Sequence, residues 1–377
     1  MTNVTPWQRL RDYGQPPRIM GLDVARALAV IGMVGAHVAT FGEVNIWEPE
    51  TYPGIVNGRS SILFGVLAGI SIAIMTGRTS IPDRASMPRY RLMLFARGSM
   101  IFLFGLFCEL LTVPVAVILT FYGILYVIAI PFVRMSIPAL LVTAGVIAVF
   151  GPIWTDLLEY TVGDIAGPGA QLVLFGTYPL SVWLPLILVG LAIGRLPLAD
   201  KGIAGVLVAF GAGISVLAYS LSAALGGAEG SQVHGPFNNP DAELTEAGEL
   251  MTRSLVASYP HSGGTLETLG SGGFAVAVIG LCLLAAGPLR VPFIPIAALG
   301  AMPLTAYTGH LVVILLGWGP AALPHDTAVW GWLTLGLVIG CTILAALFDR
   351  GPLERVVKLV SDAALGGYEK MVAATTK

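Results

Sequence analysis

Long apolar stretches, separated by short polar segments, follow one another along most of the chain. A helix needs about 20 apolar residues to cross the hydrocarbon core of a bilayer. Ten runs come close to this length, at roughly 19–41, 59–77, 92–112, 116–133, 137–156, 172–194, 203–225, 266–287, 293–316 and 329–348. They are continuously apolar rather than alternating, which excludes a membrane β-barrel. The pattern predicts an all-α, polytopic integral membrane protein with about ten transmembrane helices.

The composition indicates that lipid is the main solvent of the chain. Of its 377 residues, 55% are hydrophobic and 11% are charged, whereas about 25% are charged in an ordinary soluble domain. Too few polar residues remain to cover a soluble fold, so a cytosolic enzyme and a secreted domain are excluded. The net charge of −2 lacks the basic excess that is typical of nucleic-acid-binding proteins. The three cysteines are odd in number and predict no disulfide framework.

Basic residues set the orientation of the predicted helices. With the N-terminus in the cytoplasm, all but three of the 20 Lys and Arg residues fall on the cytoplasmic side; the exceptions are Arg26, Arg59 and Arg253. Five tryptophans fall at the outer boundary, as in an aromatic belt: Trp47, Trp154, Trp318, Trp330 and Trp332. We expect a cytoplasmic segment 1–18, a ten-helix domain 19–348 with an external loop 226–265, and a cytoplasmic tail 349–377.

The first run, LDVARALAVIGMVGAHVATF, carries the ionisable residues Asp23, Arg26 and His37. Such residues inside a membrane helix are costly and usually mark function. Asp23 and Arg26 are three residues apart and can pair on one face. Arg26 and His37 are eleven residues apart, close to three full turns. They therefore share a face, about 16 Å apart along the axis.

Two interpretations of this polar stripe stay open. In the first, Asp23 and Arg26 form a structural ion pair, and His37 makes a hydrogen bond between helices. In the second, Arg26 meets the phosphates of coenzyme A and His37 meets the thioester, one pantetheine arm away. The three ionisable residues together on one stripe favour the second interpretation.

The first run resembles the first helix of transmembrane acyltransferases. Its LD-x-x-R-A string and its R-x10-H spacing, from Arg26 to His37, are similar to acyltransferase family three. FGVLAGISIAIMTGR is similar to the second helix of these proteins, and ALGAMPLTAYTGHLV to a late helix of the heparan-glucosaminide N-acetyltransferase-like branch. The resemblance implies transfer of an acyl group from cytoplasmic acyl-CoA to a sugar or glycolipid, usually at the outer face. We expect a multi-pass protein of a bacterial plasma (inner) membrane.

Two departures from the family pattern matter. The usual Arg-Gly pair is Arg26-Ala27 in this chain. The glucosaminide-type branch has its proposed catalytic histidine in the first external loop, but the corresponding loop 42–58 contains no histidine. His37 is therefore carried over from the R-x10-H pattern, and the assignment to a branch stays open.

His310 and Tyr307 form a second candidate group, in the ninth run. His310 lies about 26 Å along that run, at a depth similar to that of His37. Tyr307 is three residues earlier and shares the same face. His310 is either a second polar partner in catalysis or a hydrogen-bonding residue between helices.

The string YPHSGGTLETLGSGG, Tyr259 to Gly273, enters the eighth run from outside. Its Ser, Gly and Thr residues can cap a helix N-terminus, whose N–H groups suit an anion or a developing oxyanion. We expect His261 and Ser262 to contact the acceptor or the acyl group, and Glu267 to orient a histidine. Plain capping is the alternative.

Arg89, Arg91 and Arg97 form a cytoplasmic cluster. Such clusters are usual topology signals. The alternative is that one of them binds the nucleotide phosphates of coenzyme A, as guanidinium groups do. No P-loop or paired-cysteine motif is present, and we expect no metal site.

These residues predict an acyl-CoA-dependent O- or N-acyltransferase that uses acetyl-CoA as co-substrate. His37 acts as general base on the acceptor or forms a transient acyl-histidine. His310 and Asp23 complete the catalytic set, and Asp23 also holds Arg26. A proton-coupled transporter or flippase is the alternative, although neither repeat symmetry nor broken helices are evident. A metal protein is a third class, with the candidate ligands His37, His261, His310 and Glu267.

The expected partners are membrane lipids, acyl-CoA and a glycan or glycolipid acceptor of the cell envelope, without nucleic acid. The 47 glycines permit close helix packing within one chain or between chains, so a homo-oligomer stays open. No motif identifies the acceptor or the acyl chain length.

Overall fold

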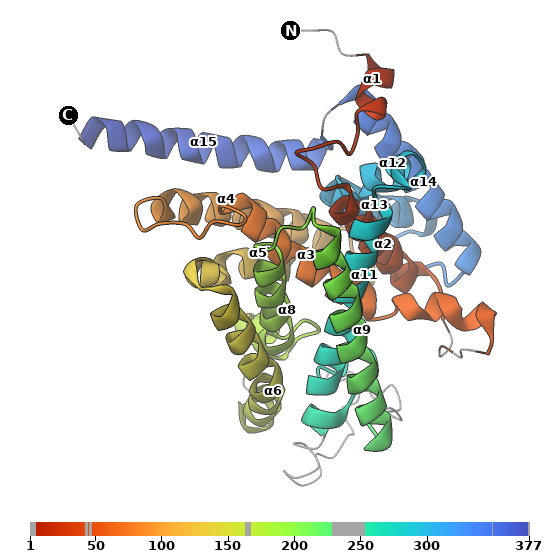
Figure 1. Ribbon diagram of the computed structural model, residues 1–377. Helices are drawn as coiled ribbons and strands as arrows, with labels where there is room; N and C mark the ends of the chain where they lie inside the picture. The colour runs from red at the N-terminus through yellow and green to blue at the C-terminus, as the bar shows by residue number, and fades with distance from the viewer. Residues whose placement is uncertain are drawn as a thin grey trace. The chain divides into compact units, whose positions relative to one another are not determined.

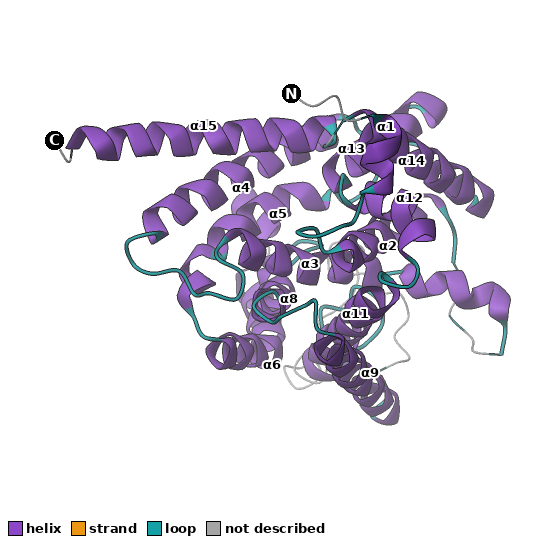
Figure 2. Ribbon diagram, turned by 45° about the horizontal axis from the view of Figure 1, so that its top comes forward, coloured by secondary structure: helices purple, strands orange, loops and turns teal. Residues whose placement is uncertain are grey.

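Every regular element in the described part of the chain is a helix, as Figures 1 and 2 show. The computed structural model describes residues 5–41, 44, 47–162, 167–227, 253–348 and 350–375. The α-helices are α1 (Pro6–Arg11), α2 (Met20–Val38), α3 (Arg59–Met75), α4 (Met87–Leu110), α5 (Ile118–Ile128), α6 (Ile137–Val162), α7 (Pro168–Ala170), α8 (Leu180–Ile193), α9 (Lys201–Ala224), α11 (Thr265–Ala285), α12 (Arg290–Gly300), α13 (Pro303–Trp318), α14 (Thr327–Leu347) and α15 (Pro352–Thr375). The 3-10 helices are η1 (Pro49–Val56) and η2 (Ile130–Arg134), and η4 (Gln171–Phe175) is a π-helix.

Six of the described helices, α2, α4, α6, α9, α11 and α14, are long and apolar enough to cross a membrane. Two further spans are possible if each bent helix pair counts as one, and α3 and α5 are shorter apolar helices. The predicted all-α, multi-pass membrane fold is confirmed. Ten spans and the cytoplasmic location of both termini stay predictions. Most of the expected external loop, residues 228–252, lies outside the described residues.

The expectation of continuous helices over 172–194 and 293–316 is wrong, because both runs are broken. The segment 168–175 meets α8 at 53°, and α12 meets α13 at 69°. Pro179 directly precedes α8 in an extended conformation, and Pro303 is the first residue of α13. Proline lacks an N–H group and disfavours helical backbone in the residue before it, so each run breaks at its proline.

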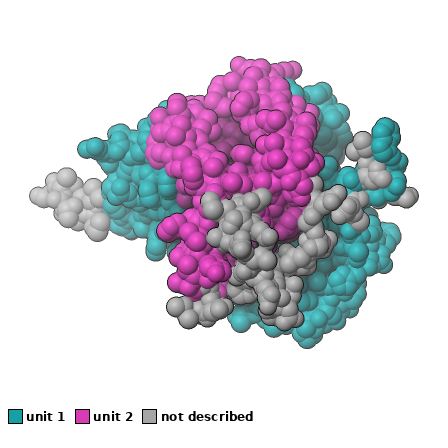
Figure 3. All heavy atoms as spheres, turned by 90° about the horizontal axis from the view of Figure 1, so that it is seen from below, with its two compact units in different colours: residues 1–60, 80–134, 282–377 teal, residues 61–79, 135–281 magenta. Residues whose placement is uncertain are grey.

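The chain forms two compact units (Figure 3). Unit 1 comprises residues 1–60, 80–134 and 282–377, and unit 2 comprises residues 61–79 and 135–281. Each unit therefore contains helices from separate parts of the sequence.

In unit 1, α2 is the central helix. Fourteen of its 19 residues are buried, and it packs against α12, α13 and α14. A Cβ atom at Gly300 of α12 would overlap the backbone carbonyl oxygen of Asp23, so only glycine permits this approach. Elsewhere in the unit α4 packs against α5, and α15 lies alongside α4 (Figures 1 and 2).

Unit 2 contains α6, α7, α8, α9, most of α3 and most of α11. α6 packs against α8. A Cβ atom at Gly190 of α8 would overlap the carbonyl oxygen of Val66 in α3, which places these two backbones in contact. Small residues thus allow close helix packing in both units, as is typical of membrane proteins.

Candidate active site

α2 and α13 of unit 1 bring His37 and His310 into contact. The Nδ1 atom of His37 lies 3.0 Å from the Nε2 atom of His310, which is hydrogen-bond distance. The ring centroids are 5.2 Å apart, and the ring planes differ by 20°. His310 is fully buried, whereas His37 is half-buried. Two helices that are far apart in the sequence therefore share one polar pair, which we call the histidine pair.

Tyr307 packs edge-on against both rings of the histidine pair. Its ring centroid lies 5.0 Å from that of His310 and 6.2 Å from that of His37, with interplanar angles of 79° and 77°. Edge-to-face packing is a preferred arrangement of aromatic rings. The buried phenol ring therefore restricts how the two imidazoles can rotate.

The hydrogen bond of the histidine pair can run in either direction. Its direction depends on which ring nitrogens carry protons, since each neutral imidazole has one donor and one acceptor nitrogen. The Nδ1 atom of His310 is buried without a hydrogen-bond partner among the described residues. When Nδ1 of His37 is the donor, Nε2 of His37 keeps a lone pair.

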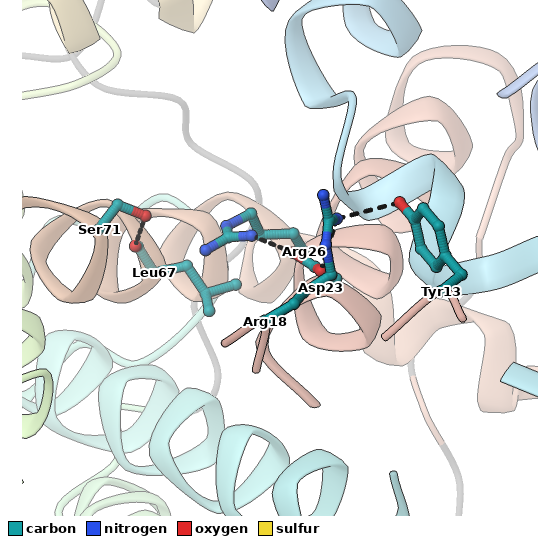
Figure 4. A network of polar contacts seen from close by, with 6 residues as sticks. All are labelled: Tyr13, Arg18, Asp23, Arg26, Leu67 and Ser71. Carbon is teal, nitrogen blue, oxygen red and sulfur yellow. Dashed lines mark hydrogen bonds and ion pairs between the residues drawn. The ribbon is translucent and has the colours of Figure 1, made fainter. Parts of the chain in front are cut away.

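The other end of α2 carries a cationic cluster, formed by Tyr13, Arg18, Asp23 and Arg26 (Figure 4). One oxygen of the buried Asp23 carboxylate accepts a hydrogen bond from Arg26 at 2.6 Å, and the other accepts one from Arg18 at 3.1 Å. Arg18 also donates to the hydroxyl of Tyr13 at 3.0 Å, and its guanidinium lies 4.7 Å from the centroid of that ring. Two guanidinium groups around one carboxylate leave a net positive charge, which suits an anionic ligand.

The cationic cluster and the histidine pair are well separated along α2. Asp23 and His37 are fourteen residues apart, or about 21 Å along the helix axis. Asp23 therefore does not reach the histidine pair, and its contacts hold the two arginines instead. Arg26 and His37, about 16 Å apart on one face, keep the spacing that the sequence predicts.

In unit 2, the carboxylate of Glu267 organises the loop that precedes α11. It accepts hydrogen bonds from the backbone N–H groups of His261 at 2.6 Å and Gly263 at 2.7 Å. The hydroxyl of Ser262 donates to the same carboxylate at 2.9 Å. The side chain of His261 is exposed, and its backbone is left-handed, with φ of 65°. The N–H groups of His261 and Gly263 are engaged by Glu267, and these contacts correspond to the capping alternative.

The three arginines of α4 have different surroundings in unit 1. Arg89 and Arg91 are exposed, and Arg89 lies 3.7 Å from the carboxylate of Glu369 in α15. Arg97 is half-buried, with its guanidinium 6.0 Å from the ring centroid of Tyr126. The Nε atom of Arg97 is buried without a hydrogen-bond partner. Only Arg97 of the three is therefore partly removed from solvent.

Among the described residues, no group of three or more His, Cys, Asp or Glu side chains is arranged to hold a metal ion. The two facing nitrogens of the histidine pair lie at hydrogen-bond distance.

A comparison with models of known protein families identifies the family of the chain. The model of the heparan-alpha-glucosaminide N-acetyltransferase catalytic domain matches residues 18–218, which is more than half of the 377 residues. The chain belongs to this family. Within the heparan-alpha-glucosaminide N-acetyltransferase family, members are membrane acetyltransferases. The predicted resemblance to this branch is confirmed, whereas the resemblance to acyltransferase family three stays a prediction. No curated protein matches the chain.

The heparan-alpha-glucosaminide N-acetyltransferase match covers only part of the candidate site. Asp23, Arg26 and His37 of α2 fall inside residues 18–218, as do the three arginines of α4. Tyr307 and His310 fall outside it, as does the loop organised by Glu267. The structure thus adds a histidine from beyond the matched region to a histidine inside it.

Three residues of these groups were not predicted from the sequence. Tyr13 and Arg18 precede the first apolar run, where Arg18 counts only as a topology signal, yet both belong to the cationic cluster. Trp330 reads as part of an aromatic belt, yet its indole N–H donates to the carbonyl of Ile31 in α2 at 2.8 Å. For Tyr13 and Arg18 the sequence offered one signal, which is that Arg18 lies five residues before Asp23, across the start of α2.

Proposed function

We propose that this membrane acetyltransferase moves an acetyl group from cytoplasmic acetyl-CoA to a hydroxyl or amine of an extracytoplasmic glycan, glycolipid or other cell-envelope acceptor. The observation that carries the proposal is the hydrogen bond between His37 and His310, which lies on apolar helices and leaves one imidazole nitrogen of His37 available. Membership of the family supports acetyl as the group transferred.

In this proposal the cationic cluster receives the phosphate groups of the donor. Guanidinium groups bind phosphates through paired N–H donors, and two of them converge on Asp23. Asp23 acts as a spacer that holds Arg18 and Arg26 side by side. The distance of about 16 Å along α2 from Arg26 to His37 then suits the extended pantetheine arm of the donor.

The histidine pair supplies the proton chemistry. Nε2 of His37 removes the proton of the acceptor hydroxyl or amine as the acceptor attacks the thioester carbonyl. The tetrahedral intermediate then expels coenzyme A as its C–S bond breaks, and the thiolate takes the proton back from His37. His310 accepts the hydrogen bond from Nδ1 of His37, which stabilises the positive charge that His37 gains.

A covalent route uses the same residues. Nε2 of His37 attacks the thioester carbonyl, coenzyme A leaves as the thiolate, and an acetyl-imidazolium forms. The acceptor then attacks the acetyl group, the C–N bond breaks, and the proton of the acceptor passes to the released Nε2 of His37. Transfer of that proton to the coenzyme A thiolate regenerates neutral His37. Detection of an acetylated His37 peptide after quenching distinguishes this route from direct transfer.

Thermal unfolding with and without acetyl-CoA tests the donor site. A ligand present at 100 times its Kd stabilises the folded state by about 2.7 kcal/mol, so saturating acetyl-CoA is expected to raise the Tm of the purified wild-type protein. Arg26→Gln is expected to remove most of this increase, whereas Arg84→Gln, at an exposed position before α4, is expected to retain it. A wild-type Tm that does not respond to acetyl-CoA would favour the transporter alternative.

A further inference from the structure

The first turn of α14 contacts the last turns of α2 on both sides of His37 in the sequence. The indole Nε1–H of Trp330 donates to the carbonyl oxygen of Ile31 at 2.8 Å. The backbone N–H of Asp326 donates to the carbonyl oxygen of Val38 at 2.8 Å. These two bonds anchor the turns that precede and follow His37, independently of the contact with His310.

The ring of Trp330 fits against α2 because residue 35 has no side chain. A Cβ atom at Gly35 would lie 2.8 Å from Cε2 of Trp330, closer than real Cβ contacts. The ring of Phe41 packs edge-on against the same indole, with centroids 5.3 Å apart and an interplanar angle of 78°. The indole is therefore fixed by a hydrogen bond, a glycine and an aromatic ring.

Trp330 differs from the rest of α14 in its hydrogen bond into α2 rather than in its burial. Of the 21 residues of α14, all described, only Cys341 and Ala345 are buried. Trp332, two residues after Trp330, is 73% exposed. A tryptophan that anchors a helix at the membrane interface has an exposed ring, because the ring has to reach the headgroup region. A hydrogen bond into the backbone of another helix serves the position of that helix instead.

We propose that Trp330 is a positioning residue for His37: it holds the last two turns of α2 so that the imidazole of His37 meets His310 at hydrogen-bond distance. This inference rests on the proposed function for its kinetic effect, but the geometric part stands on the contacts of unit 1 alone. Small displacements of a catalytic group are costly, since about 1 Å of misplacement can lower a rate 100-fold.

Trp330→Phe tests this role, because phenylalanine keeps an aromatic ring and removes the N–H donor. We expect kcat for acetyl transfer to fall about 10-fold, with the KM for acetyl-CoA unchanged, because Trp330 contacts α2 at Ile31 and Gly35, which lie after Arg26 and toward His37. Gly35→Ala, which displaces the indole from the side of α2, is expected to act in the same way. The matched control is Trp332→Phe, which is expected to stay within about twofold of wild type.

Labelling with diethyl pyrocarbonate supplies a readout that needs no activity. The reagent modifies accessible neutral imidazoles, and His310 is the fully buried member of the histidine pair. Loosening α2 is expected to raise the rate of modification of His310, read by peptide mass spectrometry, about fivefold in Trp330→Phe but not in Trp332→Phe. Gel filtration and Tm confirm that each variant is folded before it is labelled.

The two readouts separate the inference from the proposed function. If the wild type transfers no acetyl group, the proposed function fails, and the labelling of His310 still decides the role of Trp330. Increased labelling in Trp330→Phe and Gly35→Ala supports the positioning role. Labelling of both variants at the wild-type rate overturns it, as does a Trp332→Phe variant that behaves like Trp330→Phe.

Discussion

At the scale of single residues, the histidine pair limits its own protonation. A hydrogen bond between Nδ1 of His37 and Nε2 of His310 needs one donor and one acceptor, so at least one ring is neutral. In the proposed function, His37 is the donor and His310 is the acceptor of this hydrogen bond. One nitrogen of His37 then remains for chemistry, while His310 and Tyr307 hold its ring.

Replacing His310 tests its role as partner of His37. His310→Leu keeps much of the side-chain volume but removes both ring nitrogens, so the charge that develops on His37 loses its stabilising acceptor. We expect kcat to fall about 100-fold, the lower range for loss of an acid–base partner, with little change in the KM for acetyl-CoA. The control is His325→Leu at an exposed loop position. A His310→Leu variant with wild-type kcat would assign His310 to helix packing alone.

The sequence predicted part of the site at this scale. His37 and His310 stand out because ionisable residues are rare in apolar runs, and their similar depths made a pairing plausible. The pairing of Asp23 with Arg26 followed from their spacing and is present. Arg18 and Tyr13 escaped detection because their positions depend on how the segment before α2 folds back, which has no periodicity. The backbone hydrogen bonds of Glu267 also depend on loop conformation.

At the scale of helices, the first turn of α13, the helix that carries His310, is held by a side chain of another helix. Glu354 of α15 accepts hydrogen bonds from the first-turn N–H groups of α13, at 2.7 Å from Leu304 and 3.1 Å from Thr305. Its second oxygen accepts the hydroxyl of Thr305. Because Pro303 breaks the run, the first N–H groups of α13 have no acceptor within a preceding helical turn and need such a cap. This break was not predicted from the sequence, because hydropathy gives the length of an apolar run but not a bend within it.

Removing this cap should destabilise unit 1. Glu354→Ala leaves the N–H groups of α13 without their acceptor, at a cost of about 1–2 kcal/mol, comparable to loss of a helix N-cap. The expected result is a lower Tm in detergent, with Glu354→Gln intermediate because its amide oxygen still accepts. The control is Asp362→Ala on the same helix, where the exposed pair with Lys358 contributes little. Equal Tm values for Glu354→Ala and Asp362→Ala would contradict the cap.

At the scale of the whole molecule, one helix carries both parts of the proposed function, donor binding and proton transfer. α2 carries the cationic cluster near its first turn and the histidine pair near its last turn, so a single span connects donor binding to proton transfer. The all-α membrane fold could be predicted from apolar run length, because lipid permits few other structures. Run length alone does not give the number of spans, because α3 and α5 are shorter than the runs that contain them. The predicted orientation places the histidine end outside, where a cell-envelope acceptor would approach.

The most direct test of the central claim is transfer of labelled acetyl from acetyl-CoA in membranes that contain either the wild type or His37→Ala. We expect label to reach lipid-linked or glycan acceptors in wild-type membranes, and at least about 100-fold more slowly with His37→Ala. His325→Ala serves as the control and is expected to match the wild type. Transfer by folded His37→Ala at the wild-type rate would contradict the account.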